Sequence, residues 1–490
     1  MLFNSYIFIL LFLPLTVAGY FALNHVRKYA AAHVFLLLMS LWFYGYFNPK
    51  YLPVISLSIL FNYGAYRLLL KRRGQLVLIV GLIFNLGLLL YFKYTDFFIA
   101  GVNRLFHADF NLLHIALPLG ISFFTFQQVS FLVDAWRGEV PKYGFLQYAT
   151  YVCYFPQLVA GPIVTHDELI PQLMDERKKR LDWENLARGI YLFTLGLSKK
   201  VLIADTFGKA VDWGYGNSGA LSSPEAVIVI LAYTFQIYFD FSGYCDMASG
   251  IAKMMNMELP VNFDSPYKAL TITEFWNRWH MTLTRFFTKY VYIPLGGNRK
   301  GELRTYLNVL IVFFLSGLWH GAGLNFIVWG LLHGIFSVVT RKHRAFFGKL
   351  HPALSWLVTF CFVNLTWVFF RAVSCRQALR IIKNALILRF QGLSEGLVRC
   401  FAWPEFDFIL KRGITIKLFA LLHLPSPKSA HIEVLFFFGL AVLIVLGSKN
   451  AQEKARSFAP TKGRLCIAAL LMACCLCSFS GVSTFLYFGF

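Results

Sequence analysis

The chain has 490 residues, of which 58% are hydrophobic and 14% are charged, and its mean hydropathy is +0.59. Soluble globular domains carry about 25% charged residues, so the composition excludes an ordinary soluble enzyme and predicts a multi-pass membrane protein. The formal net charge of +22 would suggest nucleic acid in a soluble protein. Here no nucleic-acid partner is expected, because the excess lies in short basic clusters typical of cytoplasmic loops. Binding of anionic lipids or nucleotide phosphates is the second interpretation. The clusters are Arg27-Lys28, Lys71-Arg72-Arg73, Arg177-Lys178-Lys179-Arg180, Lys199-Lys200, Arg299-Lys300 and Arg341-Lys342-His343-Arg344.

Apolar runs along the chain predict roughly ten to thirteen membrane segments, each needing about 20 mostly apolar residues. We expect a single integral membrane domain that comprises residues 1–490. The first run lacks a basic n-region and is predicted to be a retained span, not a secretory signal. The charge bias places the N-terminus outside and Arg27 and Arg72 inside, with three spans before Arg72. The candidate runs are 5–22, 31–47, 52–70, 76–92, 112–133, 148–164, 186–198, 224–241, 306–318, 322–339, 356–370, 433–446 and 464–479.

Residues 112–164 mix apolar runs with prolines, glycines and uncharged polar side chains, including Pro118, Gln127, Gln128 and Pro156. Broken, polar backbone is tolerated at membrane depth only where protein or a water-filled cavity covers it. We therefore expect part of this stretch to line a central cavity.

Nine cysteines follow no spacing that demands a disulfide framework. Four of them, Cys466, Cys474, Cys475 and Cys477, cluster in the last apolar run, where zinc would lack polar ligands. We interpret them as small apolar residues and expect no metal site.

Polar residues concentrate in residues 236–323. Between Gln236 and Asp246, two carboxylates and several hydroxyls lie in or just after an apolar run. Asp240 and Tyr244 are four residues apart and would share one face of a helix.

A capping box formed by Thr271 and Glu274 predicts the start of an amphipathic helix, which would end before Pro294. Aromatic residues suit the membrane interface, so this helix is expected to lie on the membrane or under a cavity. One face carries Trp276, Trp279, His280, Leu283, Phe286, Phe287 and Tyr290.

His320 lies inside an apolar run that extends from Tyr306 to about Val339. An imidazole in a membrane segment is expensive to bury and is a functional-site hypothesis by default. A neutral imidazole is the usual general base at physiological pH, and Gly317 and Gly321 would let a substrate come close. The alternative is a core histidine that is hydrogen-bonded to another helix.

Three blocks carry a family resemblance: Trp276-Asn277-Arg278-Trp279-His280, the segment from Tyr292 to Arg299, and Ser316-Gly-Leu-Trp-His-Gly-Ala-Gly323. Together and in this order they resemble the bacterial branch of the membrane-bound O-acyltransferases, with the alginate O-acetylation subfamily as the nearest pattern. The resemblance extends from Asn4 through about Thr340. It implies an all-α, polytopic fold in the bacterial inner membrane, with tilted transmembrane helices in a ring around a central funnel or cavity. The motif core covers roughly residues 112–340.

The resemblance also implies an O-acyltransferase reaction. An acyl group, acetyl in this branch, would pass from a cytoplasmic thioester across the membrane to a hydroxyl of an exopolysaccharide or cell-wall polymer. His320 corresponds to the family's catalytic histidine and His280 to its second motif histidine. Whether His320 acts as a general base or carries the acyl group itself stays open. The candidate substrate- and donor-binding residues are Asp240, Tyr244, Trp276, Asn277, Arg278, Trp319, Arg299 and Lys300.

By the same resemblance we expect acetyl-coenzyme A as the donor, no bound cofactor, and a secreted acetyltransferase or polymer-synthesis protein as partner. Arg278, Arg299 and Lys300 would meet the phosphates of coenzyme A. Three alternatives stay open: D-alanyl transfer from a carrier protein to teichoic acid, a polysaccharide or lipid transporter, and a structural subunit of a secretion complex. The sequence does not specify the acceptor, with alginate, cellulose and peptidoglycan all compatible.

Overall fold

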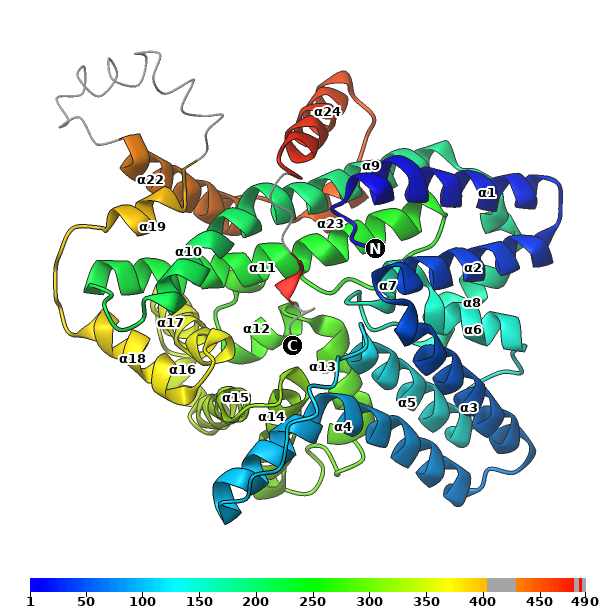
Figure 1. The fold of residues 1–490 in the computed structure, drawn as a ribbon, viewed down its shortest axis with the longest axis horizontal. Helices are drawn as coiled ribbons and strands as arrows, with labels where there is room; N and C mark the ends of the chain where they lie inside the picture. The colour runs from blue at the N-terminus through cyan, green and yellow to red at the C-terminus, as the bar shows by residue number, and fades with distance from the viewer. Residues whose placement is uncertain (403–428, 480–483, 487–490) are drawn as a thin grey trace.

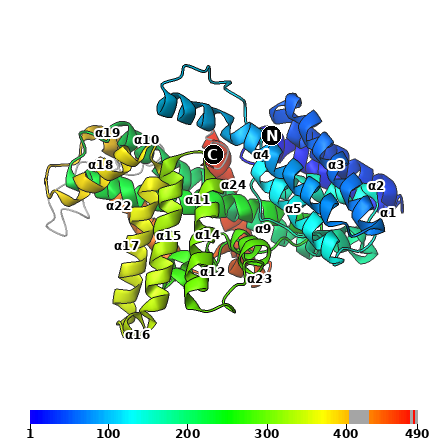
Figure 2. The same ribbon diagram turned by 90° about the horizontal axis from the view of Figure 1, so that it is seen from below.

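The computed structural model describes residues 1–402, 429–479 and 484–486, and all regular secondary structure in these residues is helical (Figure 1). The predicted all-α class is confirmed. Figure 1 shows α15 nearly end-on while α1, α2 and α11 run across the view, so the helices are strongly tilted against one another. Figure 2 shows α15 and α17 side by side along their lengths.

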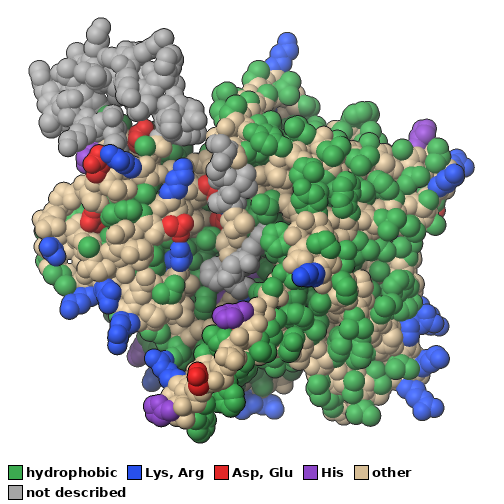
Figure 3. All heavy atoms as spheres, in the orientation of Figure 1, with side chains coloured by type: hydrophobic (Ala, Val, Ile, Leu, Met, Phe, Trp, Pro, Cys, Tyr) green, Lys and Arg blue, Asp and Glu red, His purple; other side chains and the backbone are tan. Residues whose placement is uncertain are grey.

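The N-terminal part consists of four long helices. A π-helical turn, Phe8–Phe12, continues directly into the first of them, and Pro14 lies just after this turn. The helices are α1 (Leu13–His25), α2 (Tyr29–Phe47), α3 (Leu52–Lys71) and α4 (Gln75–Phe106). Figure 3 shows hydrophobic side chains over this side of the molecule and Lys and Arg gathered at its rim, as expected for helices that face lipid.

The stretch predicted to be broken at membrane depth is divided into short helices. Residues 107–118 form no helix, and Gly120 has a φ of 71°, a conformation that favours glycine, just before the next helix begins. The helices are α5 (Ile121–Arg137), α6 (Phe145–Cys153), α7 (Phe155–Leu158) and α8 (His166–Met174).

The centre of the fold is a closely packed helix pair, α9 (Trp183–Ser198) and the 32-residue α11 (Ser223–Met254). A Cβ at Gly196 would lie 2.6 Å from the carbonyl oxygen of Gly243, and one at Gly250 would lie 2.7 Å from that of Gly189. Small residues therefore let the two backbones approach, as is typical of helix pairs in membranes. Between them in sequence lie a π-helical turn, Lys199–Ala204, and α10 (Asp205–Gly216).

Lys199 and Lys200 do not belong to a cytoplasmic loop, so this prediction is wrong. Both lie in the π-helical turn, and their ammonium groups pair with carboxylates of neighbouring helices: Lys199 with Asp246 at 2.6 Å, and Lys200 with Asp205 at 2.6 Å and Asp240 at 2.7 Å. A buried charge persists when it is paired, and the polar part of α11 supplies these partners.

The predicted amphipathic helix is broken in two. Thr271 caps its start, as predicted, by accepting a hydrogen bond from the Glu274 backbone. The chain then forms α12 (Ile272–Arg278), turns at His280, and continues as α13 (Met281–Phe287) and a π-helical turn, Thr288–Tyr292. His280 has a φ of 45°, a left-handed conformation that no α-helix contains.

The remaining helices complete the molecule, with α14 and α15 forming a hairpin at the predicted motif. They are α14 (Glu302–His320), α15 (Leu324–Lys342), α16 (Arg344–Phe347), α17 (Pro352–Arg371), α18 (Cys375–Leu386), α19 (Glu395–Arg399), α22 (Ser429–Val442), α23 (Ala451–Arg456) and α24 (Lys462–Cys477).

Eight helices in the described residues are long and apolar enough to cross a membrane. This is fewer than the roughly ten to thirteen segments expected from apolar runs. The runs 112–133 and 148–164 are broken, and the run 186–198 belongs to a helix of 16 residues. The eight are Phe8–His25, Tyr29–Phe47, Pro49–Lys71, Gln75–Phe106, Ser223–Met254, Glu302–His320, Leu324–Lys342 and Pro352–Arg371.

Candidate active site

His320 is the last residue of α14, and its side chain is buried among aromatic rings. The helix ends there because Gly321 adopts an extended conformation, with a φ of −163°. The imidazole centroid lies 4.8 Å from the Trp319 ring, 5.1 Å from Trp329 and 5.0 Å from Phe370. Only 4% of the residue is exposed, so water around the imidazole is largely replaced by protein.

The glycines around His320 serve helix packing. A Cβ at Gly317 would overlap the carbonyl oxygen of Phe326, and a Cβ at Gly321 would overlap the Phe326 ring. The prediction that these glycines leave room for a substrate is therefore wrong, because the space belongs to α15.

His280 is held at the break between α12 and α13 by a buried amide. Its Nδ1 donates to Oδ1 of Asn262 at 3.1 Å, and the same oxygen accepts from the Thr282 backbone at 3.2 Å and the Thr282 hydroxyl at 2.9 Å. Because a carbonyl oxygen only accepts, this network assigns the hydrogen to Nδ1 and leaves Nε2 as the basic nitrogen.

Trp319 brings the two motif histidines into one site. Its ring centroid lies 6.0 Å from that of His280 and 4.8 Å from that of His320. The indole Nε1 donates to the backbone oxygen of Ser122 at 3.4 Å, which ties the site to the start of α5.

A second set of contacts holds the π-helical turn after α13 against α5. Lys289 Nζ lies 3.0 Å from Asp134 Oδ2, and the Tyr290 hydroxyl donates to the same carboxylate at 2.7 Å. Burial opposes the charge on Lys289, but its hydrogen bonds to Asp134 and Glu139 outweigh that effect and raise its pKa above 10.5. The ammonium form therefore persists through neutral pH.

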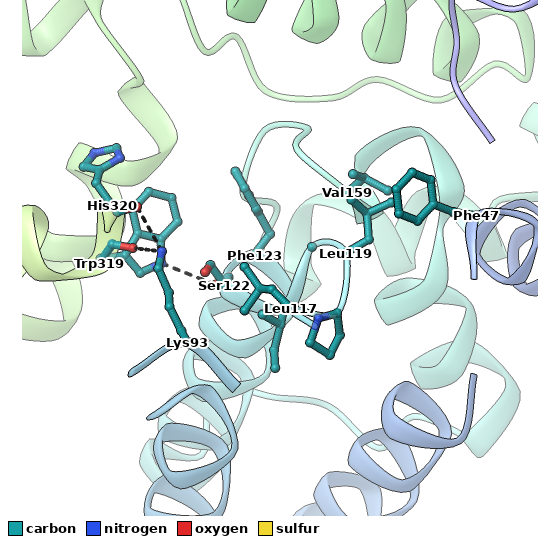
Figure 4. A pocket seen from close by; sticks show the side chains of 12 residues that line it. Phe47, Lys93, Leu117, Leu119, Ser122, Phe123, Val159, Trp319 and His320 are labelled. Atoms are coloured by element: carbon teal, nitrogen blue, oxygen red, sulfur yellow. Dashed lines mark hydrogen bonds between the residues drawn. The ribbon is translucent and has the colours of Figure 1, made fainter. Parts of the chain in front are cut away.

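A small cavity of about 60 Å³ adjoins His320 (Figure 4). As the sequence led us to expect, part of the 112–164 stretch lines a cavity: residues 117–123 and Val159 form one side, and Lys93, Trp319 and His320 form the other. Figure 4 shows Lys93 reaching from α4 toward the backbone of Trp319 and His320.

A second cavity of about 760 Å³ lies between the α12–α13 segment and helices α14, α15 and α17. Trp276, Asn277 and Ser316 line it, and so do Arg341 and Arg344. Its volume falls in the range of small-molecule and cofactor sites.

The larger cavity extends from the surroundings of His320 toward a basic cluster. Trp276 contacts Trp329 at 5.8 Å, and the Trp329 ring packs on His320. Arg341 lies 17 residues after the start of α15 at Leu324, or about 25 Å along the helix axis at 1.5 Å per residue. The arginines therefore lie at the opposite end of α15 from the histidine.

Asp240 and Tyr244 lie in a different cluster. Asp240 pairs with Lys200 and accepts from the backbone N–H of Leu486 at 3.0 Å. Tyr244 stacks on Phe3 at 4.9 Å. Both residues thus lie on α11, where Asp240 contacts Leu486 and Tyr244 contacts Phe485, and neither lines a cavity described above.

Of the predicted basic donor residues, none lines either cavity. Arg278 pairs with Glu274 at 2.9 Å and donates to the backbone oxygen of Asp264 at 3.2 Å. Arg299 and Lys300 are exposed in the loop before α14. Trp276 and Asn277, in contrast, line the larger cavity as described above.

Lys93 and Asn262 were missed from the sequence, and His333 was given no role. Lys93 was placed just beyond the end of a predicted span, although α4 continues through it to Phe106. His333 is buried beside Trp276 at 5.0 Å and hydrogen-bonds to Thr366 at 2.9 Å. Asn262 carried no signal, because its role depends on a contact with His280 that only the fold creates. Within the described ranges no three His, Cys, Asp or Glu side chains come together as metal ligands.

The fold and the site define a polytopic membrane protein with two buried histidines between a small cavity and a large one. The chain belongs to the membrane-bound O-acyltransferase (MBOAT) family, whose model matches residues 23–376. It is therefore an O-acyltransferase and a multi-pass protein of the bacterial cell membrane.

Similar proteins fall into three groups by their names. The peptidoglycan O-acetyltransferase of Helicobacter pylori is 40% identical over 100% of this chain and 98% of its own length. The probable alginate O-acetylase AlgI of Pseudomonas aeruginosa is 38% identical over 81% of this chain and 76% of its own. The teichoic acid D-alanyltransferase of Bacillus subtilis is 27% identical over 51% of this chain.

Proposed function

We propose that this protein transfers acetyl groups from cytoplasmic acetyl-coenzyme A to the outer side of the membrane, where they reach hydroxyl groups of peptidoglycan through a secreted partner. His320 is the catalytic residue. The observation that carries the proposal is the position of His320 beside the small cavity at one end of α14, while the larger cavity is lined by Ser316, one turn before His320, and by Arg341 at the basic end of α15.

The extent of similarity favours peptidoglycan over alginate as the acceptor. The match to the peptidoglycan O-acetyltransferase is 40% identical and covers 98% of that protein, whereas the matches to two alginate O-acetylases are 38% and 37% identical and cover 76% and 91% of theirs.

The chemistry requires a base for the acceptor hydroxyl. The proton of the acceptor O–H passes to His320 while the acceptor oxygen attacks the carbonyl carbon of the thioester. The C–S bond then breaks, and the proton passes from His320 to the departing thiolate. Direct attack by His320 to give an acyl-imidazole is the second route, and it balances equally.

His280 has a positioning role in this proposal. With Nδ1 donating to Asn262, Nε2 is a hydrogen-bond acceptor and can orient a hydroxyl that approaches Trp319 and His320. Its own position is fixed by the left-handed turn and by the three hydrogen bonds to Asn262 Oδ1.

The larger cavity is the binding site of acetyl-coenzyme A in this proposal, because positively charged arginines lie at the end where the phosphates would bind. The phosphates of coenzyme A would meet Arg341 and Arg344, and the thioester arm would extend past Asn277 and Ser316 toward Trp276 and His320. Guanidinium groups suit phosphates because they offer paired N–H donors. This assignment replaces Arg299 and Lys300, which were expected from sequence.

The test uses purified protein in lipid nanodiscs with radiolabelled acetyl-coenzyme A. We expect the Arg341→Glu/Arg344→Glu protein to bind the donor more weakly, with a smaller salt dependence, because fewer phosphate charges are neutralised. The Arg299→Glu/Lys300→Glu protein is the matched control, since it makes the same change in charge in an exposed loop. Equal loss in both proteins would contradict the donor site.

The partner and the donor are tested in the same preparation. We expect label to leave acetyl-coenzyme A slowly when the protein is alone and faster when a secreted acetyltransferase is added. A protein that ignored acetyl-coenzyme A but accepted an acyl group from a small carrier protein would support D-alanyl-type transfer instead.

A further inference from the structure

The end of α14 that carries His320 has three carbonyl groups that the helix itself cannot satisfy. The last carbonyls of any α-helix lack partners within the helix, and lipid offers none. Here the partners come from two adjacent residues of α4. Tyr94 donates its hydroxyl to the carbonyl of Leu318, and Lys93 Nζ donates to the carbonyls of Trp319 at 2.6 Å and His320 at 3.0 Å.

These hydrogen bonds bridge helices that belong to different parts of the fold. The helix α4 packs mainly on α3 and α5, and Lys93 is 227 residues away from His320 in sequence. Figure 4 shows the Lys93 side chain extending along the wall of the small cavity to reach the two carbonyls. The contact therefore spans a region where the helices do not pack tightly.

The charge of Lys93 suits this position. A cation at a helix C-terminus is stabilised by the helix dipole, and a lysine at membrane depth is costly unless it serves such a partner. Within the described residues, the salt bridges of the structure include none to Lys93, so its partners there are the carbonyls at the end of α14.

We propose that Lys93 is a positioning residue for catalysis: it fixes the end of α14 and thereby the position of the His320 imidazole. The inference rests on the proposed role of His320. It assigns to α4 a part in the reaction, although α4 contributes no group that exchanges a proton or an acyl chain. Misplacing a reacting group by about 1 Å can cost about 100-fold in rate.

The test compares single-turnover acetyl transfer and donor KM in four purified proteins. Lys93→Met keeps a flexible, unbranched apolar side chain but removes the charge and the hydrogen-bond donors. We expect it to transfer acetyl about 10-fold to 100-fold more slowly, with donor KM changed by less than about twofold, because the donor cavity is untouched. Lys93→Arg restores donors and charge and should recover part of the rate.

Thr95→Ala is the matched control on α4, because the Thr95 hydroxyl donates only to the Tyr91 carbonyl of its own helix at 2.6 Å. It should transfer acetyl at the wild-type rate. His320→Ala is the fourth protein and separates the two claims. If His320→Ala is inactive and folded Lys93→Met transfers at the wild-type rate, the inference on Lys93 is overturned while the proposed function stands.

Two further outcomes are decisive. If His320→Ala remains active, the proposed function fails and the role of Lys93 fails with it. If Lys93→Met yields less folded protein, the rate per folded molecule decides: an unchanged rate means that Lys93 serves stability alone. If Lys93→Met yields no folded protein, folded Lys93→Arg decides. Slower turnover in Lys93→Arg supports the positioning role, whereas wild-type kinetics mean that Lys93 serves stability alone.

Discussion

The side chain of His280 shows how a single buried amide can set the chemistry of a histidine. Asn262 receives three hydrogen bonds on one oxygen, and this arrangement fixes both the tautomer and the direction of the ring. Phe241 packs edge-on against the imidazole at 4.8 Å. The ring therefore has one orientation, which a positioning role requires.

For this reason we predict unequal effects for substitutions at His280. His280→Gln should keep part of the acetyl-transfer activity, since an amide can still donate to Asn262 and accept from a substrate. His280→Phe, which matches the ring but offers no polar atom, should lose more activity, although Asn262 Oδ1 would still accept from the Thr282 backbone and hydroxyl. Transfer rates at equal amounts of folded protein measure both effects. A His280→Gln protein as inactive as His320→Ala would assign His280 to direct chemistry.

At the scale of the elements, the hairpin of α14 and α15 determines where His320 lies. Gly317 and Gly330 allow the two backbones to touch: a Cβ at either glycine would overlap a backbone oxygen of the opposite helix. Because backbone cannot move aside as a flexible side chain can, any added atom must separate the helices.

Gly317→Ala is therefore expected to shift α14 relative to α15, to lower thermal stability through overpacking of about 1–3 kcal/mol, and to slow acetyl transfer. Gly64→Ala on α3 is the control, because no atom lies within 4 Å of the added Cβ. Thermal unfolding in detergent and transfer rates are the measurements. Equal behaviour of the two variants would show that the close approach at Gly317 does not matter.

At the scale of the whole molecule, the small cavity is distant from the basic clusters, whereas the larger cavity includes one of them. Both α4 and α14 begin after basic clusters, at Lys71-Arg72-Arg73 and Arg299-Lys300, and bring Lys93 and His320 together 18 residues after their first residues. At 1.5 Å per residue this is about 27 Å along each axis. The small cavity therefore lies far from these two basic loops, whereas Arg341 and Arg344 of the larger cavity belong to a third basic cluster at the end of α15.

This arrangement predicts the topology. Cysteines introduced at positions 72 and 341 should resist a membrane-impermeant maleimide in intact cells, whereas one at the exposed position 50, between α2 and α3, should react. The host protein would carry serine at the exposed native cysteines Cys361, Cys466 and Cys477. Labelling of position 72 from outside would reverse the orientation and with it the assignment of donor and acceptor sides.

The sequence predicted the helical class, the long N-terminal spans and the two histidines, because these depend on apolar length and on ordered motif blocks. It did not predict the break at His280, since the apolar spacing continues through residues 276–290 and the turn is imposed by Asn262 from another segment. Lys199 and Lys200 look like loop residues until α11 supplies their carboxylates. The sequence of residues 374–427, which mixes basic and aromatic side chains, predicted no placement, and part of this stretch lies outside the described residues.

Lys93 illustrates the same limit at the active site. The position was counted as the end of a span because a lysine there is often a boundary residue. The role of Lys93 can be inferred only from the fold, in which the carbonyls of Trp319 and His320 accept its hydrogen bonds. Contacts between residues so distant in sequence leave no local pattern.

The most direct measurement of the central claim is the O-acetyl content of peptidoglycan in cells that produce either wild-type protein or His320→Ala at equal membrane levels. His33→Gln is the control, because His33 is a buried histidine elsewhere that donates to the Leu173 carbonyl at 2.7 Å. The account predicts that His320→Ala lowers O-acetylation by about 100-fold or more, the cost of a lost general base, while His33→Gln retains it. Wild-type O-acetylation in the His320→Ala cells would contradict the account.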